Sequence, residues 1–494
     1  LARVWHVRES SLGLSMGMKG DGKAISFVED TAVPPERLRE YISRFQQVVA
    51  RRGTQAGVYA HASVGCLHVR PVVNLKTAEG LAQFEAIAND VANLVLEFGG
   101  ALSGEHGDGL VRGAFNEKMF GTTLYQAFRQ VKRTFDPQGI FNPGRIVDTP
   151  PITAHLRFGP GYRTAEPTTH FDFAADGGLA RAVENCSGVG LCRKTRGGTM
   201  CPSYMATRDE TDSTRGRANV LRLALSGQLG PEGLDAPAVH DALDLCLECR
   251  ACKSECPTSV DMARIKSEVL AARWDRHGAP LDVRAFGHVR RVARVGSLVA
   301  PLANAVARSR LGRALNEAVL GVDRRRTLPA WNRRTLSSRV RHTVPRSPVR
   351  AVLFADTFTE FSAPEIGVAA FEVLDRAGIG ARLVPHGCCG RPLISQGLLE
   401  AARATGSATV EALHDAAARG EAIVFLEPSC LSAMREDVPA LLRGAARERA
   451  ETVARQSVLF EDYLERELQA ARATLPLRAG PTRVALHPHR HQRA

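Results

Sequence analysis

The chain has 494 residues, a hydrophobic content of 44% and a net charge of +13. This length predicts about three domains with ordinary cores, and no run approaches the ~18 apolar residues that a membrane-spanning helix needs. Tyrosine and tryptophan are scarce and no nucleic-acid reader motif occurs, so we expect no nucleic-acid partner. Because 57 of the 65 basic residues are arginine, the charge reflects either a bias toward arginine or attraction to an anionic membrane or acidic partner.

The first residue and the cysteines bear on the cellular compartment. No secretory signal follows Leu1, and we interpret the chain as a fragment whose natural start lies upstream. The eleven cysteines are clustered rather than spread, which is more typical of metal binding in a reducing compartment than of disulfides. The expected location is the cytoplasm, with peripheral contact at the inner face of the membrane as the alternative.

Residues 1–150 show an α+β pattern. The segment AISFVED at 24–30 looks like a strand, and residues 35–53 look like an amphipathic helix. A long apolar strand region follows over 57–75, and a second helix is expected over 78–100.

Two histidines in the predicted strand region and a Glu-His pair downstream suggest a metal site. His61 and His68 are seven residues apart, so a straight strand would place them on opposite faces, whereas a bulge or bend at Gly65 would bring them together. Glu105 and His106 lie in the glycine-rich segment SGEHGDG. Two histidines and a carboxylate are a common divalent-metal set, which leaves His106 for proton transfer. From spacing alone, however, such residues are more often ordinary surface or core residues.

Residues 246–257 read CLECRACKSECP, a C-x2-C-x2-C-x3-C-P run. This is the bacterial ferredoxin spacing, in which three close thiolates hold one cluster and the cysteine before proline holds the other cluster of a pair. Zinc sites and redox thiols fit the spacing poorly. An altered partner motif, CSGVGLCRKTRGGTMCP, spans residues 186–202 and has Val189 in the middle cysteine position. The iron–sulfur subunit of succinate dehydrogenase, which this motif resembles, also has an aliphatic residue there.

Cross-ligation between the two motifs predicts two clusters. A four-thiol site predicts [4Fe–4S], and a three-thiol site predicts [3Fe–4S], because a cubane that lacks one thiolate can lose an iron. The alternative is a single cluster with the first motif as a degenerate scaffold, since the loop before its last cysteine is longer than usual. Such clusters carry one electron at a time and imply a two-electron donor nearby, typically a flavin. The four-thiol site comprises Cys201, Cys246, Cys249 and Cys252, and the three-thiol site comprises Cys186, Cys192 and Cys256.

The rest of the chain divides into two regions. Residues 276–348 are rich in arginine, helical at first and then similar to a linker. The helix over 297–321 could lie on a membrane surface, although this much alanine is more typical of a helix that packs on its own protein. From residue 349, strands alternate with helices and the last strand is expected at TRVALHP, residues 482–488, which predicts an α/β layer with a parallel sheet. Predicted strand ends bring Cys388, Cys389 and Cys430 toward one crevice.

Five motifs in order resemble one protein family over nearly the whole chain. The segments HASVGCLHVRP, SGEHGDGLVR and FDPQGIFNPGRIV resemble the C-terminal substrate domain of FAD-linked oxidases of the D-lactate, D-2-hydroxyglutarate and glycolate dehydrogenase type. The cysteine motifs and HGCCGRP resemble the ferredoxin-like and cysteine-rich CCG domains of the family's large fused members. The implied fold is an α+β multidomain protein. Its parts are an α+β FAD-oxidase C-terminal cap domain (1–150), an α-helical ferredoxin domain (175–275), a helical arginine-rich linker (276–348) and a partial α/β CCG domain (349–494).

The resemblance implies roles for the residues in the first domain. His61, His68 and Glu105 resemble the ligands of a zinc or manganese ion that holds the hydroxyl and carboxylate of the substrate and acidifies the hydroxyl. His106 resembles the general base that takes the hydroxyl proton while hydride leaves for the flavin.

Arginines and one asparagine complete the implied site. Arg8 resembles the arginine that pairs with a substrate carboxylate, and Arg70 is expected near the same pocket, where it could bind a second carboxylate. Both could instead be surface arginines. Asn142 resembles a flavin contact. The family's FAD-binding domain precedes the region matched here, so we expect FAD to be held mostly by a segment that this chain lacks.

The CCG segment resembles the cysteine-rich domain of heterodisulfide reductase and glycolate oxidase subunits, which serves in electron transfer or cluster binding. One copy of the unit is visible, and Arg490 stands where relatives usually have a cysteine. A structural α/β domain with buried thiols is the alternative.

The sequence is compatible with three functions. The first is an FAD-dependent dehydrogenase that oxidises a small D-2-hydroxy acid and passes electrons through the clusters to a quinone, cytochrome or carrier protein, as a homo-oligomer or with a partner flavoprotein chain. The second is a non-catalytic iron–sulfur subunit that docks on a separate flavoprotein, and intact metal-site residues argue against it. The third is a heterodisulfide-reductase-like enzyme, which would need a second CCG unit.

Overall fold

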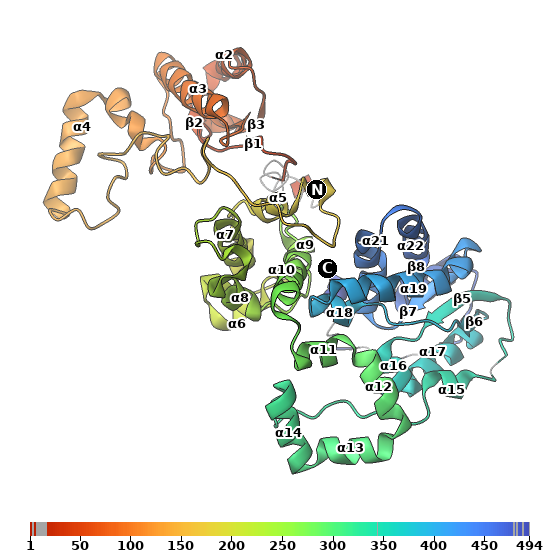
Figure 1. The fold of residues 1–494 in the computed structure, drawn as a ribbon. Helices are drawn as coiled ribbons and strands as arrows, with labels where there is room; N and C mark the ends of the chain where they lie inside the picture. Colours follow the sequence, from red (N-terminus) through yellow and green to blue (C-terminus); the bar gives the residue numbers. More distant parts are fainter. Residues whose placement is uncertain are drawn as a thin grey trace. The chain divides into compact units, whose positions relative to one another are not determined.

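The computed structural model describes residues 1, 4–5, 17–342, 344–477, 480, 483–486 and 489–493. Within these, two compact units can be distinguished, residues 1–165 and 166–494 (Figure 1). No helix of the described chain is long and apolar enough to cross a membrane.

Unit 1 is built on β4, the central strand of a four-stranded antiparallel sheet in which β1 and β2 pair with it along one edge and β3 along the other. The helices α2 and α3 supply most of the core beside this sheet, including Tyr41, Phe45 and Phe84, which are almost completely buried. Helix α3 begins at Thr77, whose hydroxyl accepts a hydrogen bond from the amide of Gly80. The elements are β1 (Lys23–Ala24), β2 (Thr31–Ala32), η1 (Pro35–Arg37), α2 (Leu38–Arg51), β3 (Ala56–His61), η2 (Ala62–Val64), β4 (Cys66–Val73), α3 (Ala78–Glu97), η3 (Gly113–Phe115) and α4 (Asn116–Phe135).

Two expectations for unit 1 need correction. The segment 24–30 is not a continuous strand: β1 ends at Ala24, and Asp30 adopts a φ of 73°, which a strand does not allow. The apolar region over 57–75 is not one continuous strand either: of the bulge or bend expected at Gly65, the structure has the bend. It is a hairpin, because Gly65 adopts a left-handed conformation after the turn η2 and reverses the chain between β3 and β4.

The first part of unit 2 is helical and contains seven of the cysteines. Its buried core includes Cys186, Cys192, Cys201 and Cys252 themselves, together with apolar side chains of the surrounding helices. Its elements are η4 (Ala174–Asp176), α5 (Leu179–Glu184), η5 (Leu191–Arg193), α6 (Pro202–Thr207), η6 (Glu210–Asp212), α7 (Thr214–Leu225), η7 (Gly233–Asp235), α8 (Pro237–Asp244), α9 (Ala251–Glu255), α10 (Met262–His277), α11 (Leu281–Gly287), α12 (Val289–Leu298), α13 (Ala300–Arg308), α14 (Arg310–Leu320) and α15 (Leu336–Val340).

The second part of unit 2 is a parallel sheet in the order β6-β5-β7-β8 with helices on both faces (Figure 1). Alternate residues of β5 face opposite cores: Leu353 packs with Leu374 of α17, and Phe354 packs with Val410 of α19. Its elements are β5 (Val349–Phe354), α16 (Thr357–Phe361), α17 (Pro364–Arg376), β6 (Gly380–Leu383), α18 (Arg391–Ser395), α19 (Leu399–Ala418), β7 (Ala422–Phe425), α20 (Pro428–Ser432), η8 (Ala433–Asp437), α21 (Val438–Leu441), α22 (Gly444–Gln456), β8 (Ser457–Leu459), α23 (Phe460–Gln469) and α24 (Arg490–Arg493).

The fourth strand of this sheet differs from the expectation. The predicted strand at 482–488 does not form over its described residues, 483–486. Its place is taken by β8, which pairs with β7 through residues 457–459. These three residues, a serine followed by two apolar residues, are buried, so a short segment after α22 completes the sheet.

Candidate functional site

The hairpin of β3 and β4 places His61 and His68 on the same face of the sheet. His61 is opposite Cys66 and Tyr59 is opposite His68 in the antiparallel register. Because opposite residues share a face and every second residue returns to it, all four side chains lie on one side. The turn therefore brings the two histidine rings to a centroid distance of 5.1 Å.

A buried carboxylate holds the loop that carries Glu105 and His106. Asp30 has no exposed surface, and its two oxygens accept hydrogen bonds from the backbone amides of Glu105 (2.9 Å) and His106 (2.8 Å). The hydroxyl of Ser103 donates to the same carboxylate at 2.7 Å. Burial alone would raise the pKa of Asp30, but these hydrogen bonds outweigh it and lower the pKa.

The side chains of this loop meet the two strand histidines. One oxygen of Glu105 lies 3.4 Å from His61 Nε2 and 3.2 Å from His68 Nε2. The same oxygen lies 3.2 Å from Nε2 of His106. His61, His68 and Glu105 each offer one ligand atom, and these atoms lie within 4.8 Å of one another.

The environment of His68 fits a bound metal ion. The residue is 2% exposed, and neither ring nitrogen has a hydrogen-bond partner among the residues that the structure describes. An unpartnered polar atom in the interior is costly, and a metal ion would satisfy it. Burial lowers the pKa of His68, which favours the neutral ring that binds metals. The residues present therefore fit Zn²⁺ or Mn²⁺ held by His61, His68 and Glu105.

Sequence reasoning missed Glu29, which also faces this group. Its carboxylate lies 3.7 Å from His106 Nδ1, 3.9 Å from His68 Nδ1 and 3.0 Å from Nε of Arg70. Glu29, His68 and His106 thus form a second group with ligand atoms within 4.8 Å. Two adjacent acids at the end of an apolar segment were the available signal, but the strand interpretation of 24–30 obscured it.

The other candidate residues of unit 1 lie in different settings. Arg70 is buried beside the histidines, where its guanidinium contacts Glu29 and donates to the Tyr59 hydroxyl at 2.9 Å. Asn142 lies on an exposed loop after α4 with a φ of 46°, and the structure does not bring it into the histidine group. Arg8 lies outside the described residues.

In unit 2, the seven ferredoxin-type cysteines line two small adjacent cavities. Met200 and Thr214 line both cavities, so the two share a wall. Val189 lines the second cavity from the middle position of its motif. The first cavity is lined by Cys201, Cys246, Cys249 and Cys252, and the second by Cys186, Cys192 and Cys256. This is the grouping that cross-ligation predicts, and four inward thiols suit a 4Fe–4S cluster.

Two side chains hold the end of the long loop before Cys201, so that the Cys201 thiol lines the first cavity. The carboxylate of Glu255 accepts hydrogen bonds from the amides of Thr199 (2.6 Å) and Met200 (3.2 Å) and pairs with Lys194. Arg217, which is 1% exposed, donates to the Cys201 sulfur at 3.4 Å and to the Ala242 carbonyl at 2.8 Å. A buried guanidinium next to the sulfur offsets thiolate charge.

A third group of thiols lies at the carboxyl ends of the parallel strands. Cys388 and Cys389 follow β6, and Cys430 lies in α20 after β7. The sulfurs of Cys389 and Cys430 are 3.1 Å apart, and both residues are buried. All eleven cysteines of the chain are free thiols.

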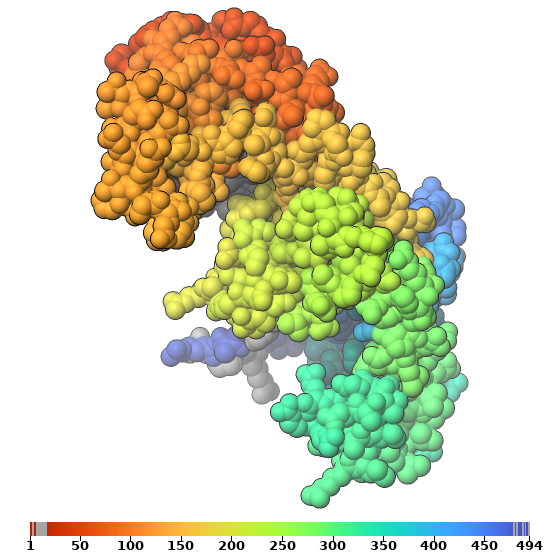
Figure 2. All heavy atoms as spheres, turned by 60° about the vertical axis from the view of Figure 1, so that its left-hand side comes forward, coloured from red at the N-terminus to blue at the C-terminus, as the bar shows by residue number. Residues whose placement is uncertain are grey.

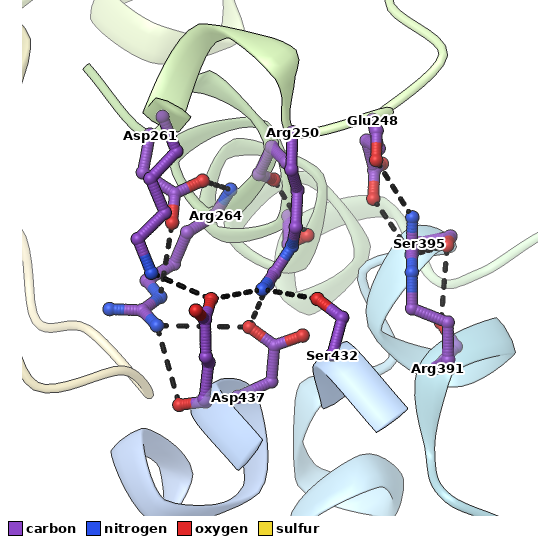
Figure 3. A network of polar contacts seen from close by, with 12 residues as sticks. Glu248, Arg250, Asp261, Arg264, Arg391, Ser395, Ser432 and Asp437 are labelled. Atoms are coloured by element: carbon purple, nitrogen blue, oxygen red, sulfur yellow. Dashed lines mark hydrogen bonds and ion pairs between the residues drawn. The ribbon is translucent and has the colours of Figure 1, made fainter. Parts of the chain in front are cut away.

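Buried ion pairs connect the segment that carries Cys246, Cys249 and Cys252 to this third group (Figure 3). Glu248 and Arg250 flank Cys249, and both have left-handed backbone conformations and buried side chains. Glu248 lies 3.2 Å from Arg391, two residues after Cys389, while Arg250 pairs with Asp437 in the helical segment that follows Cys430. Arg264 lies on the other side of Asp437, and Ser432 accepts a hydrogen bond from Arg250 at 3.0 Å.

Comparison with known families assigns both regions. Residues 1–146 match the model of the C-terminal domain of FAD linked oxidases, and residues 182–260 match the 4Fe-4S dicluster domain. The chain joins an FAD-linked oxidase C-terminal domain to a 4Fe-4S dicluster domain. The first domain implies FAD, and the second implies 4Fe-4S clusters. The histidine group lies in the oxidase domain, and the two cysteine cavities lie in the dicluster domain.

Several relatives match the chain over different lengths. A D-2-hydroxyglutarate dehydrogenase of Pseudomonas putida is 30% identical over 88% of this chain and 48% of its own length. A D-lactate dehydrogenase of Archaeoglobus fulgidus is 33% identical over 26% of this chain and 28% of its own. One subunit of the anaerobic glycerol-3-phosphate dehydrogenase of Escherichia coli is 27% identical over 53% of this chain and 67% of its own. The chain spans about half the length of the Pseudomonas relative.

Proposed function

We propose that this chain is part of an FAD-dependent dehydrogenase that oxidises a D-2-hydroxy acid, D-lactate or D-2-hydroxyglutarate, to the 2-oxo acid. The observation that carries the proposal is the position of His61 and Glu105 beside the buried His68, whose ring nitrogens have no hydrogen-bond partner among the described residues. Relatives named D-2-hydroxyglutarate dehydrogenase and D-lactate dehydrogenase support it.

Each side chain has a place in this chemistry. His61, His68 and Glu105 would hold Zn²⁺ or Mn²⁺, which supplies Lewis acidity toward the substrate hydroxyl. His106 is half exposed beside Glu105, where it can take the hydroxyl proton as general base. Glu29 faces Nδ1 of His106 at 3.7 Å and would stabilise the charged ring that results. Arg8 and Arg70 are proposed to contact substrate carboxylates, and Asn142 the flavin.

Electrons would leave FAD through the dicluster domain. Cys201, Cys246, Cys249 and Cys252 would hold a [4Fe–4S] cluster, and the three remaining thiols would hold a [3Fe–4S] or second cluster. A quinone, cytochrome or carrier protein would be the acceptor, and the assembly would be a homo-oligomer or a complex with a flavoprotein chain. The proposed compartment is a reducing one such as the cytoplasm, because the cysteines are grouped as cluster ligands rather than paired in disulfides.

A second candidate is an iron–sulfur electron-transfer subunit. Similarity to the anaerobic glycerol-3-phosphate dehydrogenase protein over 53% of this chain favours it, because the name of that relative describes one subunit of an enzyme. In that case the histidine group would bind no substrate.

Equilibrium dialysis with labelled D-2-hydroxyglutarate and D-lactate separates the two candidates. We expect the anaerobically purified chain to bind at least one of them in the presence of Mn²⁺, and His61→Asn/His68→Asn to lose this binding. His414→Asn, a histidine of α19 in unit 2, serves as control. No binding of either acid by a chain that contains its clusters would favour the electron-transfer subunit.

A further inference from the structure

The positive charge of the chain is concentrated in one segment. Residues 276–348 contain sixteen arginines, no lysine and three acidic residues, a net charge of +13. The whole chain also has a net charge of +13, so all other residues together are neutral. An overall bias toward arginine would not produce this distribution, and the segment therefore calls for a local explanation.

The arginines of this segment line a large cavity in unit 2. The cavity measures about 1460 Å³ and lies between α12, the residues around α15 and the ends of β5 and β6. Helix α12 lies beside α16 on this side of the sheet (Figure 1). Five arginines of the segment line the cavity: Arg290, Arg291, Arg294, Arg333 and Arg341. The segment that carries α11 to α14 reaches the molecular surface in Figure 2.

Four of these guanidinium groups have no acidic partner. Arg291, Arg294, Arg333 and Arg341 are exposed, and the described residues offer none of them an ion pair. The one carboxylate in the lining, Glu360, already accepts hydrogen bonds from the amide and hydroxyl of Ser337. Like charges crowded without counter-charges repel one another, and an anionic ligand would relieve this repulsion.

The cavity also has the position expected of a ligand site. It opens at the carboxyl ends of β5 and β6, the edge where parallel α/β sheets bind ligands. Arg290 is held at this edge, since its guanidinium donates to the carbonyl of Ala355 at 3.0 Å. Cys388, the least buried of the three clustered thiols, forms part of the wall.

We propose that this arginine-lined cavity binds a polyanionic ligand through its phosphate or carboxylate oxygens, next to Cys388. The planar guanidinium fork suits both groups because it donates two parallel hydrogen bonds. The oxyanions could belong to a free metabolite-sized anion or to lipid headgroups, and both would meet the same four unpaired arginines. This site is separate from the histidine group, so its existence does not depend on the proposed dehydrogenase activity.

Calorimetric titration of the full chain with inorganic pyrophosphate tests the proposal. The test variant is Arg291→Gln/Arg294→Gln/Arg333→Gln, and the control is Arg324→Gln/Arg325→Gln/Arg326→Gln. The control removes the same charge from the same segment at positions that do not line the cavity. We expect the test variant to bind at least about tenfold more weakly and the control to stay within about twofold, with thermal unfolding unchanged in both.

Flotation with phosphatidylglycerol vesicles, compared with phosphatidylcholine vesicles, distinguishes the source of the anion. Flotation of the natural chain and the control but not of the test variant identifies a lipid headgroup, whereas pyrophosphate binding without flotation identifies a soluble anion. Equal losses of pyrophosphate affinity or flotation in both triple variants would show that binding depends on the net charge of the segment and not on the cavity. This result would overturn the proposal. So would a natural chain that binds neither pyrophosphate nor anionic vesicles.

Discussion

His68 is the residue on which the candidate metal site most depends. Both of its ring nitrogens are buried and have no hydrogen-bond partner in the described part of the chain, while His106 is half exposed and lies beside Glu105. We expect His68→Asn to weaken Mn²⁺ binding by at least about tenfold, and His106→Asn to change it by less than about threefold. Metal content after dialysis would show this difference. Equal losses in both variants would instead favour the alternative ligand group of Glu29, His68 and His106.

Asp30 supports the candidate metal site indirectly, because its carboxylate accepts hydrogen bonds from the backbone amides of Glu105 and His106. Asparagine at this position would place an NH₂ group, which is a donor, opposite donors that now bond to a carboxylate oxygen. A buried hydrogen bond is therefore lost, which lowers the free energy of unfolding by about 1–3 kcal/mol. We expect Asp30→Asn to speed hydrogen exchange over residues 103–109 and to weaken Mn²⁺ binding. Ser103→Ala removes only one donor to the same carboxylate and should have a smaller effect. Unchanged hydrogen exchange over residues 103–109 in Asp30→Asn would show that the loop does not depend on the Asp30 carboxylate.

At the scale of elements, the hairpin turn is what joins the two histidines. Gly65 has a φ of 68°, and a Cβ built there would lie 1.8 Å from the Val33 carbonyl oxygen. We expect Gly65→Ala to destabilise the hairpin by about 1–3 kcal/mol or more, because both the conformation and the space exclude a side chain. Gly57 in β3 has open space around it, so Gly57→Ala is the matched control. Hydrogen exchange of residues 56–73 measures both, and similar protection in the two variants would contradict the prediction.

The ion pair of Arg250 and Asp437 joins the segment that carries Cys246, Cys249 and Cys252 to the α/β part of unit 2. Both side chains are buried, and removing one partner of such a pair typically costs about 3–5 kcal/mol. We expect Asp437→Asn to lower the iron content of the anaerobically purified chain, and Arg250→Met/Asp437→Leu to recover part of it. Arg403→Gln, which breaks an exposed pair with Glu400, should leave the iron content unchanged. Full iron content in Asp437→Asn would show that the loop holds its shape alone.

At the scale of the whole molecule, the sequence predicted what depends on local spacing. The spacing of the cysteine motifs and the rule of cross-ligation predicted which thiols meet, since each cavity is lined by cysteines of both motifs. A bulge or bend at Gly65 was expected to bring His61 and His68 together, and the structure has a hairpin turn there. The close approach of Gly65 to Val33 in this turn is not revealed by any local pattern. Strand β8 was missed because three buried residues after a polar helix give too little periodicity.

We propose that an oxidase domain with a metal-dependent substrate site is joined to a two-cluster electron pathway. Anaerobic purification with iron and sulfide counted per chain, followed by EPR before and after dithionite, tests the electron pathway directly. We expect about seven iron atoms, with an oxidised-state [3Fe–4S] signal from the site of Cys186, Cys192 and Cys256 and a second signal on reduction. About four iron atoms and a signal only on reduction would contradict the second cluster. A chain with zinc instead of iron on its cysteines would contradict the electron pathway and the dehydrogenase proposed to use it.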